Sequence, residues 1–491
     1  MTAALLLAAG LAGRAAAFPA VEVDPAWPAA GVTVAVRTYA RGALQTIPDG
    51  DGGILLAWQD ARGLDPASCN CRSMDDLYAQ RLDSAGHACW GAQDLAICKW
   101  RGLWGGTDFL AGFHPDGAGG AIVIWEHADG PVGTFAQHVT KDGELKWGPE
   151  GSTVFERDLG LKFTARSARL GREIWLGLDA AEESRVRLTA CVEGSSALEC
   201  EPPVEITLSA PFLTVSVLPG PRPDACLLVF STRTASGTVC WAQSVAASGA
   251  ARAVRILEAA GDGFPYQVRP DGGGGLMLAA AVKATTPARR PPPPAGAPPG
   301  AAPPAEPPAL PYQLVIQRAD ETGRPRWGGG VAVAPLPSPD VPFALAASAR
   351  GDLAVGWTDA GDPAHIRVTV FDSEGRPRWA APALLADRAE RTRPIGLLAT
   401  AEGWLAVWTE WEAGATESLR VAFLAGTRAE ATRGVSPDVE TPQPSPAGGA
   451  VIVRRNSPVS LERLDPTPGG AFVFALDTIP RAVLAYRLKA Q

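Results

Sequence analysis

The sequence predicts an all-β protein, and three observations lead to that fold class. Short apolar segments recur along the chain, each bounded by Gly, Pro, Asp or Asn, as strands are. The 45 prolines and 54 glycines disfavour long helices. An internal repeat is also present, because PDGDGGILLAWQD at 48–60 returns as PDGAGGAIVIWEH at 115–127. Repeat units of this kind stack to bury a shared core, so the repeat decides the architecture.

Each repeat unit comprises four predicted strands, A to D, over about fifty residues. Strand B is the apolar stretch after the double glycine, as in 53–60, and strand A precedes it, as in 108–113. Strand C follows, as in LYAQRL at 77–82, and leads into strand D. The glycines between A and B supply the positive φ values that a hairpin turn needs. This acidic turn could also bind calcium, but it lacks ligands at alternate positions, so we interpret it as a turn alone.

Tandem four-stranded antiparallel units are the sequence form of a β-propeller. The stretch 27–36 has the pattern of a strand D without its A, B and C, and the last twenty or so residues have the pattern of A, B and C without a D. Joined, they complete one blade and close the ring, which removes the exposed sheet edges. We therefore predict a single propeller over residues 25–491, with eight blades, or seven because two units are degenerate. The predicted B strands begin at 53, 119, 173, 226, 275, 351, 403 and 470.

The first residues indicate export. Residues 1–18 have an apolar run and small residues, as a signal peptide does, although an apolar N-terminal strand is the alternative. No stretch has the roughly 20 apolar residues that a membrane-spanning helix needs. We expect a secreted or periplasmic protein that is a monomer or part of a surface complex.

The eight cysteines all lie in the first half of the chain, and their even number in an exported protein predicts disulfides. Cys191 and Cys200 flank a predicted hairpin, and so do Cys226 and Cys240, so each pair could staple its own hairpin. The first group has the ligand types of a zinc site, but its spacing matches no common one, so we favour disulfides and predict no metal. That group consists of Cys69, Cys71, Cys89 and Cys98.

Two insertions interrupt the repeat in B–C connections, at 62–76 in the first blade and at 285–311 in the fifth. The second insertion is rich in proline and should be an extended, disordered loop. The B–C and D–A connections emerge on one face of a propeller, so both insertions decorate that face. We expect a protein or glycan ligand there.

Two sets of residues are candidates for a site. An acid recurs after strand B and could bind a cation or a cationic ligand, or only cap its own turn, which we favour. Three tryptophans break the repeat on connections of the decorated face and could contact a ligand or only pin the loops, which we again favour. The strand-B tryptophans, in contrast, should pack between blades. The acids are Asp60, Asp359, Glu410 and Asp477, and the three tryptophans are Trp100, Trp104 and Trp411.

Several function classes find no support. The net charge of −8 argues against a nucleic-acid surface. None of the five histidines pairs at the HExxH spacing, and neither a GxSxG elbow nor a phosphate-binding loop occurs. We therefore predict a binding module without catalysis and without a cofactor. The alternative is a polysaccharide hydrolase or lyase whose channel-facing carboxylates converge within about 10 Å.

A G-x-x-x-W element recurs between strands C and D, and an aspartate precedes its glycine by three residues at Asp83, Asp320 and Asp372. It resembles the tryptophan-docking motif of quinoprotein-like propellers, such as the pyrroloquinoline-quinone dehydrogenases and the outer-membrane assembly lipoprotein repeats. In that family the aspartate falls four residues before the glycine, so the resemblance is to the blade architecture. It implies tryptophans wedged between neighbouring blades and carries no catalytic residue. The four elements are Gly86/Trp90, Gly143/Trp147, Gly323/Trp327 and Gly375/Trp379.

Overall fold

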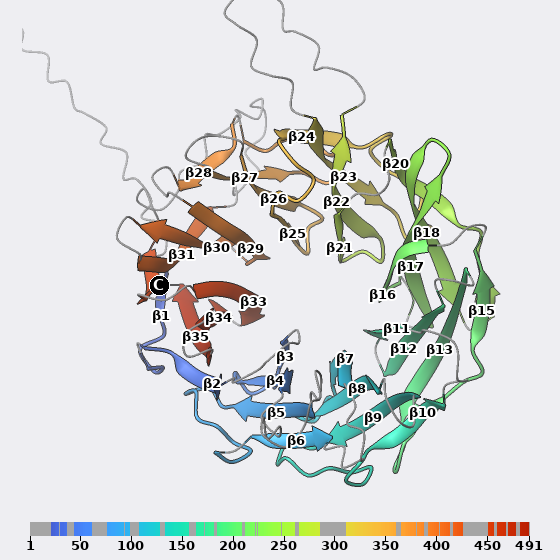
Figure 1. Ribbon diagram of the computed structural model, residues 1–491, viewed down its shortest axis with the longest axis vertical. Coiled ribbons are helices and arrows are strands. Elements are labelled where there is room, and N and C mark those ends of the chain that lie inside the picture. Colours follow the sequence, from blue (N-terminus) through green and yellow to red (C-terminus); the bar gives the residue numbers. More distant parts are fainter. Residues whose placement is uncertain are drawn as a thin grey trace, which may run out of the picture.

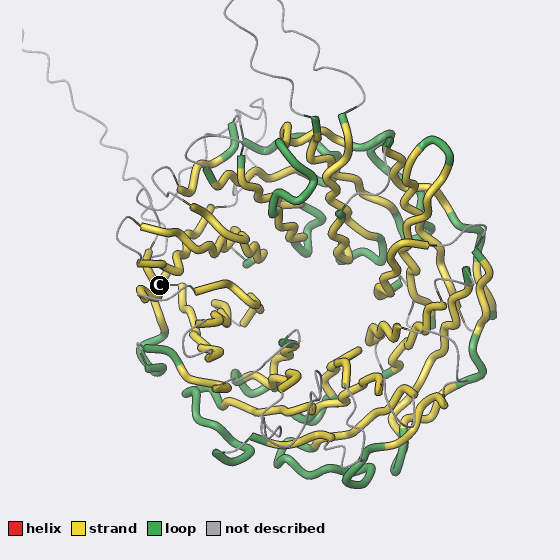
Figure 2. The backbone as a smooth tube through the Cα atoms, viewed as in Figure 1, coloured by secondary structure: helices red, strands yellow, loops and turns green. Residues whose placement is uncertain are grey.

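The protein is an eight-bladed β-propeller, and every regular element among its described residues is a strand (Figures 1 and 2). Five blades have four strands, and in the other three the outermost strand is broken into two. In the computed structural model the described residues run from 21 to 490 and leave out positions 29, 37–43, 61–75, 93, 99–107, 128–132, 157–163, 171, 181–183, 209–211, 221, 223, 247, 261–264, 285–310, 360–364, 380, 387–390, 402, 413–415, 426–449, 456–458, 468–469 and 478–481.

In blades 1 to 7 the strands follow one another in sequence order from the centre outward. Blade 1 comprises β3 (Gln45–Pro48), β4 (Ile54–Asp60), β5 (Asp76–Leu82) and β6 (Leu95–Cys98). Blade 2 comprises β7 (Asp108–Pro115), β8 (Ala121–His127), β9 (Gly133–Val139) and β10 (Ser152–Glu156). Blade 3 comprises β11 (Thr164–Leu170), β12 (Glu173–Ala180), β13 (Arg185–Glu193), β14 (Leu198–Cys200) and β15 (Val204–Thr207). Blade 4 comprises β16 (Phe212–Pro219), β17 (Ala225–Thr234), β18 (Gly237–Ala246), β19 (Gly249–Ala250) and β20 (Val254–Ala259). Blade 5 comprises β21 (Tyr266–Pro270), β22 (Leu276–Lys283), β23 (Tyr312–Ala319) and β24 (Val331–Leu336). Blade 6 comprises β25 (Phe343–Ala347), β26 (Leu353–Thr358), β27 (Ile366–Phe371) and β28 (Ala383–Ala386). Blade 7 is β29 (Arg391–Ala399), β30 (Gly403–Glu412), β31 (Thr416–Ala425), β32 (Ala450–Arg455).

The ring is closed by both ends of the chain. Blade 8 takes β33 (Val459–Thr467), β34 (Gly470–Asp477) and β35 (Ala482–Ala490) from the C-terminal part. Its outermost strand is β1 (Val21–Val23) together with β2 (Val32–Val36), and both pair antiparallel with β35. Figure 1 shows β1 and β2 beside β35 near the C-terminal end of the chain. The prediction of eight blades and of closure by the N-terminal segment is confirmed.

The repeated acidic turn is a structural element. The Asp49 carboxylate, 4% exposed, accepts hydrogen bonds from the backbone N–H groups of Asp51 and Gly53 at 2.8 Å each. Its other oxygen lies 2.9 Å from the Arg81 guanidinium on strand C of the same blade. A Cβ at Gly53 would lie 2.3 Å from the Leu82 carbonyl oxygen, so the double glycine lets strands B and C approach closely. The turns at Asp116 and Asp271 repeat this arrangement, with His138 and Arg318 in the place of Arg81.

Tryptophans pack between neighbouring blades at the C–D turns. The Trp90 indole of blade 1 lies against Gly143 of blade 2, and its Nε1 donates to the Lys141 carbonyl oxygen at 2.9 Å. Trp27 packs in the same way on Gly86, and Trp327 on Gly375. Their Nε1 atoms donate to the carbonyl oxygens of Ser84 and Ser373 at 2.9 and 3.1 Å. Each blade of this kind is thereby clamped to the next by one side chain that combines apolar area with a hydrogen bond.

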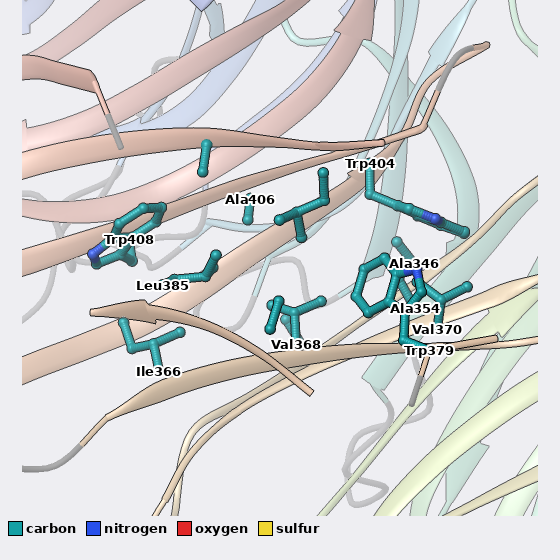
Figure 3. Packing of buried hydrophobic residues seen from close by; sticks show 14 residues of the cluster. Ala346, Ala354, Ile366, Val368, Val370, Trp379, Leu385, Trp404, Ala406 and Trp408 are labelled. Carbon is teal, nitrogen blue, oxygen red and sulfur yellow. The ribbon is translucent and has the colours of Figure 1, made fainter. Parts of the chain in front are cut away.

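The apolar core lies between the blades. The strand-B tryptophans Trp58, Trp125, Trp357 and Trp408 are at most 2% exposed, which confirms that they pack between blades. Figure 3 shows one such cluster, in which Trp404 and Trp408 of β30 face residues of β26 and β27. Because each cluster draws on two adjacent sheets, no blade has a complete core of its own.

One predicted disulfide forms and a second does not. Cys191 and Cys200 are bonded across β13 and β14, and their Cα atoms are 4.0 Å apart. The pairing of Cys226 with Cys240 is wrong, since both are free buried thiols. In the β17–β18 hairpin Cys226 pairs with Val245 and Cys240 with Ser231, so the cysteines are five rungs apart. They also face opposite sides of the sheet, since each belongs to the core on a different side of blade 4. In the first cysteine group, Cys69 and Cys71 lie outside the described residues, as do residues 1–18.

Candidate functional site in the central channel

The first strand of each blade borders the central channel (Figure 1). A cavity of about 440 Å³ opens there between the inner strands of blades 1 to 5, which is within the size range of small-molecule sites. Several of the side chains that line the cavity are polar or charged. They include Gln45, His114, Ser167, Ser216, Tyr266 and Arg269.

Three basic residues occupy equivalent positions in their inner strands, and we call them the basic crescent: His114, Arg169 and Arg269. Each is the penultimate residue of its inner strand, β7, β11 or β21, so each stands at the same distance from its A–B turn. The corresponding residue of β16 is Leu218. His114 and Arg269 line the cavity, and Arg169 is close enough to His114 to lower its pKa.

Arg269 is an exposed side chain that lines the cavity and has no acidic partner among the described residues. Solvent reaches its side chain, and no carboxylate of the described residues forms an ion pair with it. The protein atoms around it, and next the Arg463 guanidinium, lower the pKa of Arg269. Arg463 belongs to β33 of blade 8, and its own charge is balanced by Asp465 at 3.0 Å. Asp465 also accepts a hydrogen bond from Thr46, so this acid is fully engaged with blades 8 and 1.

His114 and Ser167 form a pair across the seam between blades 2 and 3. His114 Nε2 lies 2.9 Å from Ser167 Oγ, and the Ser167 hydroxyl donates to the carbonyl oxygen of Ala111 at 3.2 Å. Burial, and next the charge of Arg169, lower the pKa of His114 to about 4, so its imidazole is neutral at physiological pH. Ala111 is the extra residue of a β-bulge in β7, and Gly112 follows it. A Cβ at Gly112 would lie 2.0 Å from Ser167 Oγ, so only glycine leaves room for the pair.

Other polar side chains of the inner strands tie adjacent blades together. Gln267 Nε2 donates to the Phe343 carbonyl oxygen at 2.6 Å, from blade 5 to blade 6. The Tyr266 hydroxyl lies 2.6 Å from Thr214 Oγ1 of blade 4, and burial raises the pKa of Tyr266. These bonds hold the wall of the cavity in a defined shape.

The acids predicted after strand B do not line this cavity where the structure describes them. Asp359 lies 2.6 Å from Arg367 Nε, and Glu410 lies 2.5 Å from Arg420 Nε, in each case within its own blade. Asp60 and Asp477 end β4 and β34, and their side chains lie outside the described residues. Neither Asp359 nor Glu410 therefore supports the prediction that these acids converge on a pocket.

Two of the three tryptophans predicted to contact a ligand, Trp100 and Trp104, lie outside the described residues. Residues 285–310 of the proline-rich insertion lie outside them as well. Trp411 was expected in a connection, but its backbone belongs to β30, where it pairs with Arg391 and Glu417.

Among the residues that can be placed, no group of three His, Cys, Asp or Glu side chains could hold a metal ion. The part of the chain that the structure describes holds no helix long and apolar enough to cross a membrane.

Sequence reasoning missed His114, Ser167 and Arg269. A signal for two of them was present, because His114 and Arg269 each immediately precede a Pro-Asp-Gly turn. The position of that turn places both residues at the end of strand A that leads into the A–B turn. Ser167 lacks such a marker, since its blade has a short A–B turn without the motif.

No family model matches the sequence, and no curated protein sequence matches it. Solved structures similar to the chain include the Dos1 propeller, at 8% identity over 96% of this chain and 95% of that one, with a TM-score of 0.45. Sqt1 of Chaetomium thermophilum, bound to the N-terminus of the ribosomal protein L10, is 11% identical over 93% and 100%, with a TM-score of 0.46. The polysaccharide lyase Uly1 is 9% identical over 93% and 91%, with a TM-score of 0.41. These proteins differ in function, and the site of this chain has to be judged on its own residues.

Proposed function

We propose that this propeller is a binding module for an anionic glycan, and that an acidic sugar unit occupies the channel cavity. The observation that carries the proposal is Arg269, a guanidinium in a ligand-sized cavity without a carboxylate of its own among the described residues. An exposed guanidinium that lines the cavity and has no acidic partner among the described residues is available to an anionic ligand. The guanidinium fork matches a carboxylate in a bidentate geometry, so a ligand carboxylate would supply the missing partner.

The rest of the cavity suits a hydroxylated ligand. Ser216 and Gln45 present a hydroxyl and an amide beside the basic crescent. Sites for polar ligands place a few such groups on a rigid wall, because each fixes one orientation of the ligand. Here the inner strands supply the wall, and the hydrogen bonds between blades keep it in place.

The test measures binding by isothermal titration calorimetry with sodium oligogalacturonate and with a neutral malto-oligosaccharide of equal length. We expect only the acidic oligosaccharide to bind, and Arg269→Met to weaken it roughly 10- to 100-fold, as for the loss of a hydrogen bond to a charged group. The matched control is Arg255→Met, because Arg255 is 61% exposed on the outer strand β20 and pairs with Glu258. Equal binding of both sugars, no binding of either, or an equal effect of the two variants would overturn the proposal.

We also propose that the protein is exported. The Cys191–Cys200 disulfide supports an oxidising compartment, in which such bonds persist. The resemblance to quinoprotein-like propellers and a ligand-binding role of the decorated face stay predictions. A mass spectrum of the protein from its native host would test export, since removal of residues 1–18 is expected.

A further inference from the structure

We propose that Ser167 and His114 form a nucleophile–base pair that hydrolyses an acyl ester bearing a carboxylate group, with the basic crescent holding that carboxylate. This inference rests on the proposed anion site and adds a chemical step to it. It differs from the hydrolase alternative considered from the sequence, which depended on converging carboxylates.

The pair has the geometry of an activated serine. Ser167 Oγ and His114 Nε2 are 2.9 Å apart, within the range over which a base accepts the proton of a nucleophile once the hydroxyl turns from the Ala111 carbonyl oxygen to the imidazole. Both side chains line the cavity, so a bound molecule can reach them. The imidazole is neutral, which is the state that accepts a proton.

The neighbouring charge links binding to reactivity. Arg169 is close enough to His114 to weaken its basicity, and it occupies the same position in its inner strand as Arg269 does. A carboxylate bound at the crescent offsets that positive charge. The base is therefore stronger when the anionic ligand is present, and this favours anionic esters over neutral ones of the same size.

The reaction needs no further reagent than water. Ser167 Oγ forms a bond to the ester carbonyl carbon, and its proton passes to His114 Nε2. The bond between that carbon and the alkoxy oxygen breaks, and His114 returns the proton to the departing oxygen. Water then attacks the acyl-serine with His114 as base, which releases the acid and restores the hydroxyl.

A purely structural role would use the same atoms. Gln45 and Gln267 also bridge inner strands, through the carbonyl oxygens of Leu110 and Phe343. Those bridges join an amide to a backbone carbonyl, whereas Ser167 faces an imidazole as well as a carbonyl. The experiment must therefore measure the reactivity of the hydroxyl and not the stability of the seam.

The first measurement is labelling of the unmodified protein with a fluorophosphonate, followed by peptide mass spectrometry. We expect the label on Ser167. Ser216 is the internal control, because it lines the same cavity and has no imidazole hydrogen-bonded to it in the described part of the chain. No label on Ser167, or equal labelling of both serines, would overturn the inference, and this measurement does not depend on the folding of any variant.

The second measurement is hydrolysis of mono-4-nitrophenyl glutarate against that of 4-nitrophenyl butyrate. We expect faster hydrolysis of the anionic ester, and a loss of roughly 100-fold or more in Ser167→Ala and in His114→Gln, as for removal of a nucleophile or general base. Calorimetry with oligogalacturonate separates the two proposals, since Ser167→Ala should still bind it. Retained binding without labelling or hydrolysis leaves the anion site standing and removes the chemistry. Loss of binding in Arg269→Met together with unchanged labelling is expected, because the label carries no carboxylate.

Discussion

Replacing Gly143 by alanine tests the packing of tryptophan between blades. Gly143 has φ +84°, and a Cβ there would lie 2.8 Å from Trp90 Cδ1 of the preceding blade. The left-handed backbone costs an L-residue about 1–2 kcal/mol. Forcing the indole out of its place adds about 1–3 kcal/mol, as overpacking does. We therefore expect Gly143→Ala to lower the free energy of unfolding by about 2–5 kcal/mol.

The same blade supplies a matched control. Gly148 has φ +80°, and a Cβ there would meet no atom within 4 Å. Gly148→Ala should therefore show only the backbone cost of about 1–2 kcal/mol. Urea unfolding followed by circular dichroism measures both, and a signal from the backbone avoids the changed tryptophan fluorescence.

A double-mutant cycle then isolates the contact. Trp90→Ala alone should cost about 3–5 kcal/mol, because it opens a cavity and leaves the Lys141 carbonyl oxygen without its donor. In that background Gly143→Ala should cost only about 1–2 kcal/mol, since the indole is gone. Equal costs at Gly143 and Gly148, or strict additivity of Trp90→Ala and Gly143→Ala, would refute the reasoning.

Two further expectations concern titration and the disulfide. The folded pKa of His114, about 4, lies below its ordinary 6.5, so the unfolded chain binds the proton more readily. Stability should fall as pH drops from about 6.5 to 4, by at most about 3 kcal/mol, and His114→Asn should flatten that slope in urea titrations against pH. Replacing Cys191 and Cys200 by alanine together should cost about 2.5 kcal/mol, because their separation of 9 residues closes a short loop. Reductant should lower the thermal midpoint of the unmodified protein but not of that variant, and an equal effect on both would contradict the assignment.

Much of the fold is readable from the sequence because each blade is a local object. Strands A to D of one blade pair with their neighbours in the chain, and the Asp-Gly turns between A and B mark the register. All eight predicted B strands lie in the B position of a blade, and residues 27–36 complete the last one. Similar local reasoning found the Cys191–Cys200 pair, whose strands are adjacent and short.

The same reasoning misplaced Cys226 and Cys240 because nearness in sequence does not give the side of a sheet. Side chains on a strand alternate between its two faces, and a hairpin register decides which rungs meet. Only the paired β17 and β18 show that these cysteines point into different cores.

The sequence by itself determined the four-stranded blade and its turns, since these depend on contacts between segments that follow one another, and it left the number of blades at eight or seven. The tertiary structure alone decided the site. His114 and Ser167 are 53 residues apart and meet because two blades stand side by side. Arg269 and Arg463 come from blades 5 and 8, and the Arg463 charge helps to lower the pKa of Arg269 because the ring curves back on itself. Residues gathered around a channel belong to no single repeat, so no pattern within a repeat can reveal what they hold in common.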